Sequence, residues 1–307
     1  MIAKAYSLIK PYVHRTPVMT SRLLDEMSNA QLFFKCENFQ RAGAYKIRGA
    51  THAILNLSNA QKNSGVVTHS SGNFAQALAL AAKSLDISAT IVMPDSAPKV
   101  KIDAVRQYGA KIIMCEPTLA AREETANAIV NDTGATFIHP SNNIQVILGQ
   151  GTACFELLQE YPNIDIVINP LGGGGLIAGS CLAAKELNPN VKVVGAEPFA
   201  VDDAYRSLHS GKIETNASTE TIADGLKTQL GDKNFPIILK QVDEIFRVEE
   251  ADIILAMQLL WERMKIVVEP SSAVCLAAVL KYPNCFAGKN VGVVLSGGNV
   301  DLSRLPF

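Results

Sequence analysis

Four consecutive glycines stand out among the residues of this chain that could do chemistry. The segment 171–176 reads LGGGGL and follows the apolar run 165–170. Glycine has no Cβ, so the backbone there can close around an anion and present its N–H groups at the positive end of the next helix. This pattern favours a small phosphorylated ligand. A flexible turn is the simpler alternative, and a dinucleotide site is disfavoured because its glycines are spaced as Gly-x-Gly-x-x-Gly after an early strand.

A lysine far upstream is the second candidate. Lys46 lies between the apolar residues Tyr45 and Ile47. A lysine beside another cation, here Arg48, is most often a solvated surface charge. In an apolar pocket, however, a lysine loses proton affinity and becomes a usable nucleophile. The chemistry of this chain therefore depends on whether Lys46 is desolvated.

Serine- and asparagine-rich turns form a third group. Segment 68–77 reads THSSGNFAQA, segment 269–272 reads EPSS, and segment 296–301 reads SGGNVD. In the simplest interpretation Ser70 and Ser71 cap a helix that begins near residue 73, and the last segment is an ordinary turn at a strand end. In the functional interpretation the same hydroxyl and amide groups contact a ligand.

Short β-branched runs alternate with longer Ala-rich runs along the chain, which predicts parallel sheets covered by helices. The predicted strands are 32–36, 65–69, 89–93, 111–115, 164–169, 192–196, 244–248 and 291–296. The predicted helices are 44–56, 73–85, 99–108, 120–132, 145–161, 177–187, 249–265 and 270–280.

The predicted elements suggest two lobes. Residues 65–142 contain three strand–helix units and form a smaller lobe inserted into a larger one of residues 1–64 and 143–307. Ligands of open α/β sheets bind at the carboxyl ends of strands. We therefore expect the loops 70–73, 172–175 and 296–299 to surround one cleft.

Composition narrows the class of protein. The chain has 307 residues, 48% of them hydrophobic and 19% charged, which is typical of a compact enzyme and argues against disorder. A net charge of −1 gives no electrostatic basis for nucleic-acid binding, and the apolar runs are too short to span a membrane. The six cysteines lack paired spacing and the N-terminus lacks a secretory pattern. We therefore expect reduced thiols and a cytoplasmic location.

Taken together, these motifs resemble the serine racemase and serine/threonine dehydratase family, most closely the eukaryotic-type serine racemases. Members of this family are pyridoxal-phosphate (PLP) enzymes of the tryptophan-synthase-β-like fold, called fold type II. The resemblance implies an α/β protein of two lobes, each with a mostly parallel sheet flanked by helices. The segments that carry the resemblance follow the family order along nearly the whole chain: 41–50, 68–77, 171–176, 222–225, 261–265, 269–272 and 296–301.

The resemblance assigns the cofactor contacts. It implies that Lys46 forms a Schiff base with PLP and takes the substrate α-proton from one face. Asn73 would donate to the ring hydroxyl, and Ser296 would contact the pyridine nitrogen. A serine cannot stabilise a full positive charge on that nitrogen, which disfavours transamination and leaves racemisation or β-elimination. The phosphate would lie on the glycine loop, at Gly172, Gly173, Gly174, Gly175 and Leu176.

The substrate contacts implied by the resemblance indicate the reaction. Ser71 would carry a proton on the face opposite Lys46, while Ser70 and Asn73 would contact the substrate carboxylate. Dehydratases of the family often have alanine at the Ser71 position. We therefore expect a serine racemase, an isomerase that also acts as a lyase by dehydrating L-serine to pyruvate and ammonia. L-threonine is expected as a further substrate of the dehydration.

Two alternatives stay open. Arg122 would lie at the mouth of the site and accept a second carboxylate, which points to a threonine or threo-3-hydroxyaspartate ammonia-lyase with little racemase activity. Phe74, where the family commonly has histidine, favours this alternative because it alters the pocket beside the substrate. A regulatory protein that binds PLP or a nucleotide without turnover is the alternative from another class.

Two further ligand sites follow from the resemblance. Glu197, the carbonyl of Val201 and Asp203 would hold a structural Mg²⁺ or Ca²⁺, although acids before a helix are more often simply solvated. An activating ATP would contact Ser21, Gln76, Tyr108 and Arg41, with Arg41 in place of the usual lysine and Ser141 in place of an asparagine. A homodimer is also implied. His139 receives only a structural interpretation.

Overall fold

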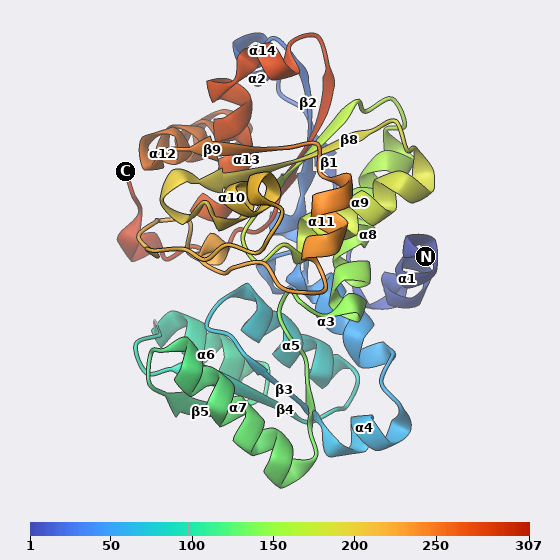
Figure 1. Ribbon diagram of the computed structural model, residues 1–307, viewed down its shortest axis with the longest axis vertical. Helices are drawn as coiled ribbons and strands as arrows, with labels where there is room; N and C mark the ends of the chain where they lie inside the picture. Colours follow the sequence, from blue (N-terminus) through green and yellow to red (C-terminus); the bar gives the residue numbers. More distant parts are fainter. Residues whose placement is uncertain (98) are drawn as a thin grey trace.

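The chain forms two separate sheets, seen one above the other in the computed structural model, which describes residues 1–97 and 99–307 (Figure 1). The larger sheet has the order β1-β2-β10-β7-β8-β9 and the smaller has the order β5-β4-β3-β6. The strands are β1 (Val18–Met19), β2 (Gln31–Cys36), β3 (Val66–His69), β4 (Ala89–Pro94), β5 (Lys111–Cys115), β6 (Thr136–Phe137), β7 (Ile166–Pro170), β8 (Lys192–Pro198), β9 (Glu244–Val248) and β10 (Asn290–Leu295).

Both sheets are parallel except for the antiparallel pair β1–β2. Successive side chains of a strand point to opposite faces, so a strand that is buried on both sides is apolar throughout. On β7, Ile166 and Ile168 pack in one core with β10 and helix α13 (Pro270–Lys281), whereas Val167 packs in a second core with helices α8 (Ile144–Glu160) and α9 (Gly175–Leu187).

The four strands of the smaller sheet all lie between residues 66 and 137. One face packs against helices α3 (Lys46–Leu55) and α5 (Asn73–Ser84), and the other packs against α7 (Leu119–Thr133). Because Ile47 and Ile54 of α3 belong to this core, residues before 65 contribute to the smaller sheet as well. The lobe boundaries at residues 64 and 143 stay a prediction.

The eight predicted strands and eight predicted helices are all present, with ends that differ by a few residues. The helix expected over 249–265 divides into α12 (Glu250–Leu259) and a π-helix (Leu260–Met264), which ends at Lys265 in the left-handed conformation with φ 59°. The other helices are α1 (Ile2–Ile9), α2 (Arg22–Ser28), α4 (Asn59–Ser64), α6 (Lys99–Gln107), α10 (Asp203–Ser210), α11 (Phe235–Gln241) and α14 (Pro283–Phe286).

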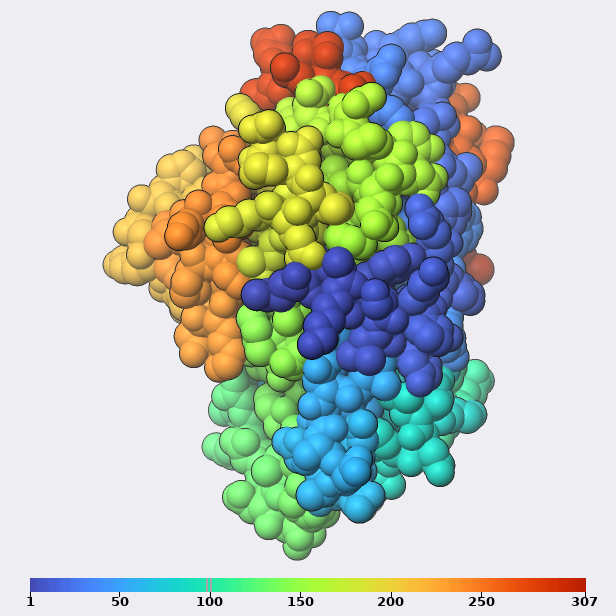
Figure 2. Space-filling model, turned by 90° about the vertical axis from the view of Figure 1, so that its right-hand side faces the viewer, coloured from blue at the N-terminus to red at the C-terminus, as the bar shows by residue number. Residues whose placement is uncertain are grey.

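Helix α1 lies across the middle of one side of the molecule, between the segments that belong to the two sheets (Figure 2). The carboxylate of Glu186 on α9 accepts hydrogen bonds from the amino terminus and from the backbone N–H groups of Ile2 and Ala3. Within residues 1–97 and 99–307, no helix combines the length and apolar character needed to cross a bilayer.

Candidate active site

Lys46 is the first residue of α3 and is partly buried, with its amine against protein groups. Nζ donates a hydrogen bond to the carbonyl oxygen of Pro140 at 3.2 Å. The ring centres of Tyr45 and Phe74 lie 5.1 and 5.9 Å from Nζ. Burial lowers the pKa of Lys46 to about 8, and the negative charge of Glu269 opposes this shift. The amine therefore loses its proton far more readily than a solvated lysine does.

The glycine loop connects β7 to the N-terminus of α9. Gly174 has φ 76°, and among the described side chains none caps α9. A Cβ on Gly173 would lie 2.5 Å from Ser141 Oγ, and one on Gly175 would lie 2.6 Å from Gln150 Oε1. Side chains are thus excluded on the loop, while the first N–H groups of the helix keep their capacity to bind an anion.

Asn73 joins two of the three loops that were expected to share a cleft. Its Oδ1 accepts a hydrogen bond from Asn299 Nδ2 at 2.9 Å, which confirms that loops 70–73 and 296–299 meet. Its Nδ2 donates to both carboxylate oxygens of Glu269, at 2.8 and 3.0 Å. The Asn73 amide is therefore already engaged on both sides, and a contact with a ring hydroxyl stays a prediction.

Ser296 follows β10 and is buried. Its hydroxyl lies 3.1 Å from the hydroxyl of Ser272 on α13. Ser272 Oγ also donates to the carbonyl oxygen of Gly297 at 2.6 Å and accepts from the N–H of the same residue at 2.7 Å. Ser272 thus holds the Ser296 hydroxyl in place, and either hydroxyl can be the donor.

Ser70 and Ser71 lie in the turn between β3 and α5 and are partly buried. Helix α5 begins at Asn73 with no side-chain cap from any residue that the structure describes. Ser70 Oγ instead accepts the backbone N–H of Gly72 at 3.3 Å. The capping interpretation of these serines is therefore wrong.

Arg122 on α7 lies near the carboxyl end of β3. Its Nε donates to the carbonyl oxygen of Thr118 at 3.2 Å. Burial lowers the pKa of His69 to about 4, and the charge of Arg122 contributes to that shift. Because His69 directly precedes Ser70, the guanidinium is close to the edge of the sheet that carries the predicted substrate contacts.

His139 has a structural function that its sequence context only partly indicated. Its Nδ1 accepts the backbone N–H groups of Ser141 and Asn142, at 3.1 and 2.8 Å. Burial lowers the pKa of His139 to about 4, so the ring is neutral. The turn that it holds contains Pro140, the hydrogen-bond acceptor of Lys46, and Ser141, which packs against the glycine loop. The glycine loop 172–175, the third loop expected at the cleft, is therefore connected to Lys46 through this turn.

The residues expected to hold a cation lie at the carboxyl end of β8, and all are buried. Glu197 Oε1 accepts the N–H of Tyr205 at 2.7 Å, whereas Oε2 has no partner among the described residues. Burial, reinforced by the charge of Asp203, raises the pKa of Glu197 well above its usual range. Burial also raises the pKa of Asp203 to about 6. In the described part of the chain, no three His, Cys, Asp or Glu side chains cluster as metal ligands.

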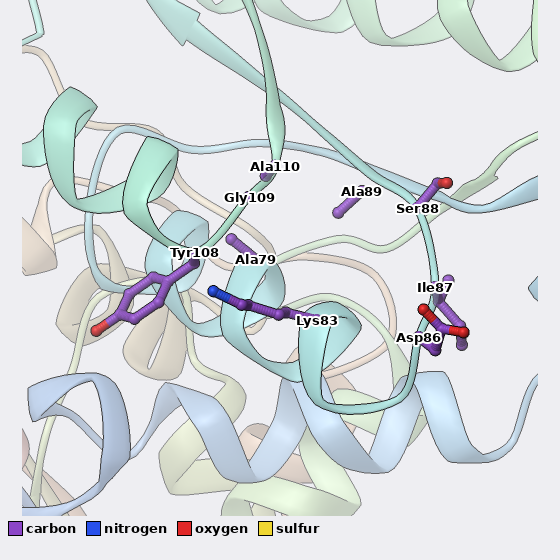
Figure 3. A pocket seen from close by; sticks show the side chains of 9 residues that line it. All are labelled: Ala79, Lys83, Asp86, Ile87, Ser88, Ala89, Tyr108, Gly109 and Ala110. Carbon is purple, nitrogen blue, oxygen red and sulfur yellow. The ribbon is translucent and has the colours of Figure 1, made fainter.

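The residues expected to contact ATP lie on several elements. Arg41 donates to the carbonyl oxygen of Tyr12 at 2.7 Å and to Ser84 Oγ at 3.2 Å. Tyr108 lines a surface pocket at the N-terminal ends of β4 and β5. Lys83 lines the same pocket, and its side chain extends toward Tyr108 (Figure 3). This edge of the smaller sheet is opposite the cleft. The other residues expected to contact ATP are not among the described residues that line this pocket: Ser21, Arg41 and Gln76.

A lysine amine with a lowered pKa is linked through the turn at Pro140 and Ser141 to an uncapped, glycine-rich helix N-terminus. This arrangement fits an aldehyde cofactor that carries a phosphate. A family model described as pyridoxal-phosphate dependent enzyme matches residues 9–297. The chain belongs to this family. Its two mostly parallel sheets with flanking helices are fold type II, and the fold prediction is confirmed.

Proteins similar to this chain in sequence and in structure include racemases and lyases. The chain is 50% identical over 309 residues to a serine racemase of Arabidopsis thaliana, covering 99% of this chain and 93% of that one. It is 49% identical over 303 residues to a beta-hydroxyaspartate dehydratase of Paracoccus denitrificans, covering 99% of this chain and 96% of that one. The crystal structure of a serine racemase from Dictyostelium discoideum matches with a TM-score of 0.94 and 48% identity, over 98% of both chains.

Proposed function

We propose that this chain is a serine racemase that also dehydrates L-serine to pyruvate and ammonia, with L-threonine as a further substrate. The observation that carries the proposal is the position of Lys46 against the first turn of α5. Its Nζ lies 5.9 Å from the ring centre of Phe74, three residues after Ser71. This position supports a base and a hydroxyl in one small region, as inversion at a carbon atom requires.

The roles of the residues follow from their chemistry. Bound PLP supplies an electron sink that makes the α-proton of an amino acid acidic. Lys46 would hold the cofactor and take that proton from one face, and Ser71 would return a proton from the other. The N–H groups at the start of α9 would bind the phosphate, and Ser296 would contact the ring nitrogen. Ser70 would orient the substrate carboxylate.

Removal of the Ser71 hydroxyl tests the racemase assignment. In Ser71→Ala we expect D-serine formation to fall by about 100-fold or more, the usual contribution of a proton-transfer group, while elimination from L-serine falls much less. Chiral chromatography of the serine pool and a pyruvate assay measure the two reactions. Ser70→Ala is the matched control, in which both reactions fall together because both need the carboxylate oriented. Racemisation that persists in Ser71→Ala would refute the two-face assignment.

A hydroxyaspartate or threonine ammonia-lyase is the second candidate. The proximity of the Arg122 charge to His69 favours it, because a guanidinium there suits a substrate with a second carboxylate. The similarity to the Paracoccus dehydratase agrees with it. Incubation with L-serine, L-threonine and threo-3-hydroxyaspartate decides between the candidates. Ammonia release that is fastest from hydroxyaspartate, without D-serine from L-serine, would establish the lyase.

A structural divalent cation is part of the proposal. The unpartnered Glu197 Oε2 and the neighbouring Asp203 carboxylate form a buried, oxygen-rich site that suits Mg²⁺ or Ca²⁺. The carbonyl of Val201 and water molecules would complete the coordination. The cation would stabilise the loop before α10 and stay out of the chemical step.

Activation by ATP, dimer formation and a cytoplasmic location complete the proposal. Arg41 suits a triphosphate because a guanidinium can bind two oxygens at once. The free state of all six cysteines agrees with a reducing compartment. Enzyme assays with and without ATP, and light scattering of the purified protein, test activation and homodimer formation directly.

A further inference from the structure

Glu269 is a buried carboxyl group that the proposed mechanism does not use. It precedes Pro270 at the N-terminus of α13, and only 3% of its surface is exposed. A carboxylate in this position commonly caps its own helix. In the described structure Glu269 forms no such side-chain cap and turns both oxygens to the Nδ2 group of Asn73.

The surroundings of Glu269 fix its position. Its backbone N–H donates to the carbonyl oxygen of Gly297 at 3.1 Å. A Cβ on Gly297 would lie 2.8 Å from Glu269 Oε1, so the carboxylate packs directly on that backbone. On the other side of the Asn73 amide, Asn299 Nδ2 donates to Asn73 Oδ1 and, at 2.8 Å, to the carbonyl oxygen of Ala42. These contacts leave the Asn73 amide a single orientation.

Glu269 and the start of α3 pack on the same loop. The backbone N–H of Tyr45, the residue before Lys46, donates to the carbonyl oxygen of Ser296 at 3.0 Å. The Cβ on Gly297 that would meet Glu269 would also lie 3.0 Å from Ala44 Cβ, so the charge of Glu269 acts close to Lys46.

Burial and the charge of Asp224 raise the pKa of Glu269 to about 7, while the Asn73 hydrogen bond and the charge of Lys101 oppose this shift. Glu269 in turn favours the protonated form of Lys46.

The other titratable groups that face Lys46 do not offer a competing charge near neutral pH. His139 is kept neutral by burial, with a pKa of about 4. Burial raises the pKa of the Tyr45 hydroxyl above its usual range, so this group is neutral too. Glu269 is therefore the charged group that favours the ammonium form of Lys46 against the effect of burial.

We propose that Glu269 is a positioning residue of the cofactor site, which fixes the Asn73 amide against loop 296–299 and sets by its charge how readily Lys46 releases its proton. This inference rests on the proposed role of Lys46 as the residue that holds PLP. It assigns Glu269 a function in cofactor uptake, since an amine must be neutral to attack an aldehyde.

The proton state of Lys46 is measured in the PLP-free protein. Isotope-labelled acetic anhydride, applied in trace amounts across a pH series, reports the neutral fraction of the amine by mass spectrometry. In Glu269→Gln the midpoint of Lys46 labelling moves to lower pH by roughly one unit, because a nearby negative charge that favours the ammonium form is gone. Glu160→Gln, which removes a carboxylate from a surface ion pair with Arg15, is the matched control and leaves the midpoint unchanged.

The positioning role is measured separately. Glu269→Asp keeps the charge but withdraws the carboxylate from Asn73, so we expect a midpoint close to that of the unmodified chain and PLP binding about tenfold weaker. In an Asn73→Ala background, Glu269→Asp has no further effect on PLP binding, because the shared contact is already lost. Circular dichroism verifies the fold of each variant, and if Glu269→Gln does not fold, Glu269→Asp decides.

The outcomes separate this inference from the proposed function. An unchanged or raised labelling midpoint in Glu269→Gln overturns it, and so does an equal loss of PLP affinity from Glu269→Asp with and without Asn73. Lys46→Ala tests the proposed function independently. A visible PLP absorbance band that survives in Lys46→Ala refutes the role of Lys46 itself, whereas loss of that band with an unmoved Glu269→Gln midpoint refutes only the role of Glu269.

Discussion

Burial gives the reactive residues of this chain their properties, with opposite effects on acids and bases. Desolvation disfavours the charged form of each group. It therefore lowers the pKa of Lys46 to about 8 and raises that of Glu269 to about 7, which brings an amine and a carboxyl into the same pH range. Burial raises the pKa of the Glu197 and Asp203 carboxyl groups for the same reason.

The shifted carboxyl groups predict how a divalent cation affects stability. Without the cation, folding raises the pKa of Asp203 to about 6, so its protonated form contributes stability at low pH that is lost as the pH rises through that value. A cation needs both carboxylates deprotonated. We therefore expect the rise in melting temperature caused by Mg²⁺ or Ca²⁺ to be small near pH 5 and several degrees near pH 8.

Calorimetry with and without a chelator at the two pH values measures this effect. In Glu197→Gln the response to the cation disappears, because the amide keeps the shape of the side chain but removes a charged ligand. A cation response that is as large near pH 5 as near pH 8, or that survives in Glu197→Gln, contradicts the site.

The sequence motifs identified cleft residues that lie close together along the chain. They did not identify the contacts between residues of different motifs. The glycine run, Lys46 and the serine-containing turns each form a local pattern. The contact of Asn73 with Glu269 joins residues that are 196 positions apart. One sequence contains no signal for such a pair, although an acidic residue directly before Pro270 in a motif that resembles a known site was a reason to consider Glu269.

At the scale of elements, the prediction was most accurate for two short strands that are only partly buried. The strands β5 and β9 have the predicted bounds, because each is a five-residue run whose pattern differs from its neighbours. The strands β1 and β6 were missed, since each has two residues and too few to show a periodicity. The π-helix after α12 was also missed, because its residues continue the helical pattern of α12 and only the backbone hydrogen bonding changes.

The N-terminus of α9 gives a prediction about the glycine loop. An alanine at Gly174 would have to adopt φ 76°, and its Cβ would lie 2.7 Å from Leu230 Cδ2. We expect Gly174→Ala to lower the free energy of unfolding by about 2–4 kcal/mol, the sum of backbone strain and overpacking. PLP affinity should fall as well, because the loop that would receive the phosphate has to shift.

Gly211→Ala separates strain from overpacking. Gly211 has φ 74°, similar to Gly174, but a Cβ there meets no described atom within 4 Å. The cost is then backbone strain alone, about 1–2 kcal/mol, with PLP affinity unchanged. Urea unfolding and absorbance titration measure both quantities. Equal effects of the two substitutions would mean that packing around the glycine loop does not matter.

At the scale of the whole molecule, a buried ion network connects the two sheets. Arg48 on α3 donates to both carboxylate oxygens of Glu37, at 2.7 and 2.8 Å, and to both of Glu156 on α8, at 2.9 and 2.8 Å. Lys35 on β2 donates to Glu156 at 2.6 Å. The two cations and two carboxylates balance in charge, and each is almost fully buried. Because α3 packs in the core of the smaller sheet, the network fixes Lys46 relative to the larger one.

Arg48 therefore stabilises the fold through its ion pairs with Glu37 and Glu156. Its sequence context did not indicate this, because charged side chains are usually solvated. Arg48→Met keeps much of the side-chain volume but leaves Glu37 and Glu156 short of a cation in a dry interior. We expect it to lower the free energy of unfolding by about 3–5 kcal/mol, as measured by urea titration. Arg15→Met, which breaks the exposed pair with Glu160, should cost less than about 1 kcal/mol. If the two substitutions cost the same, the network does not hold α3, and the position of Lys46 between the sheets must depend on apolar packing alone.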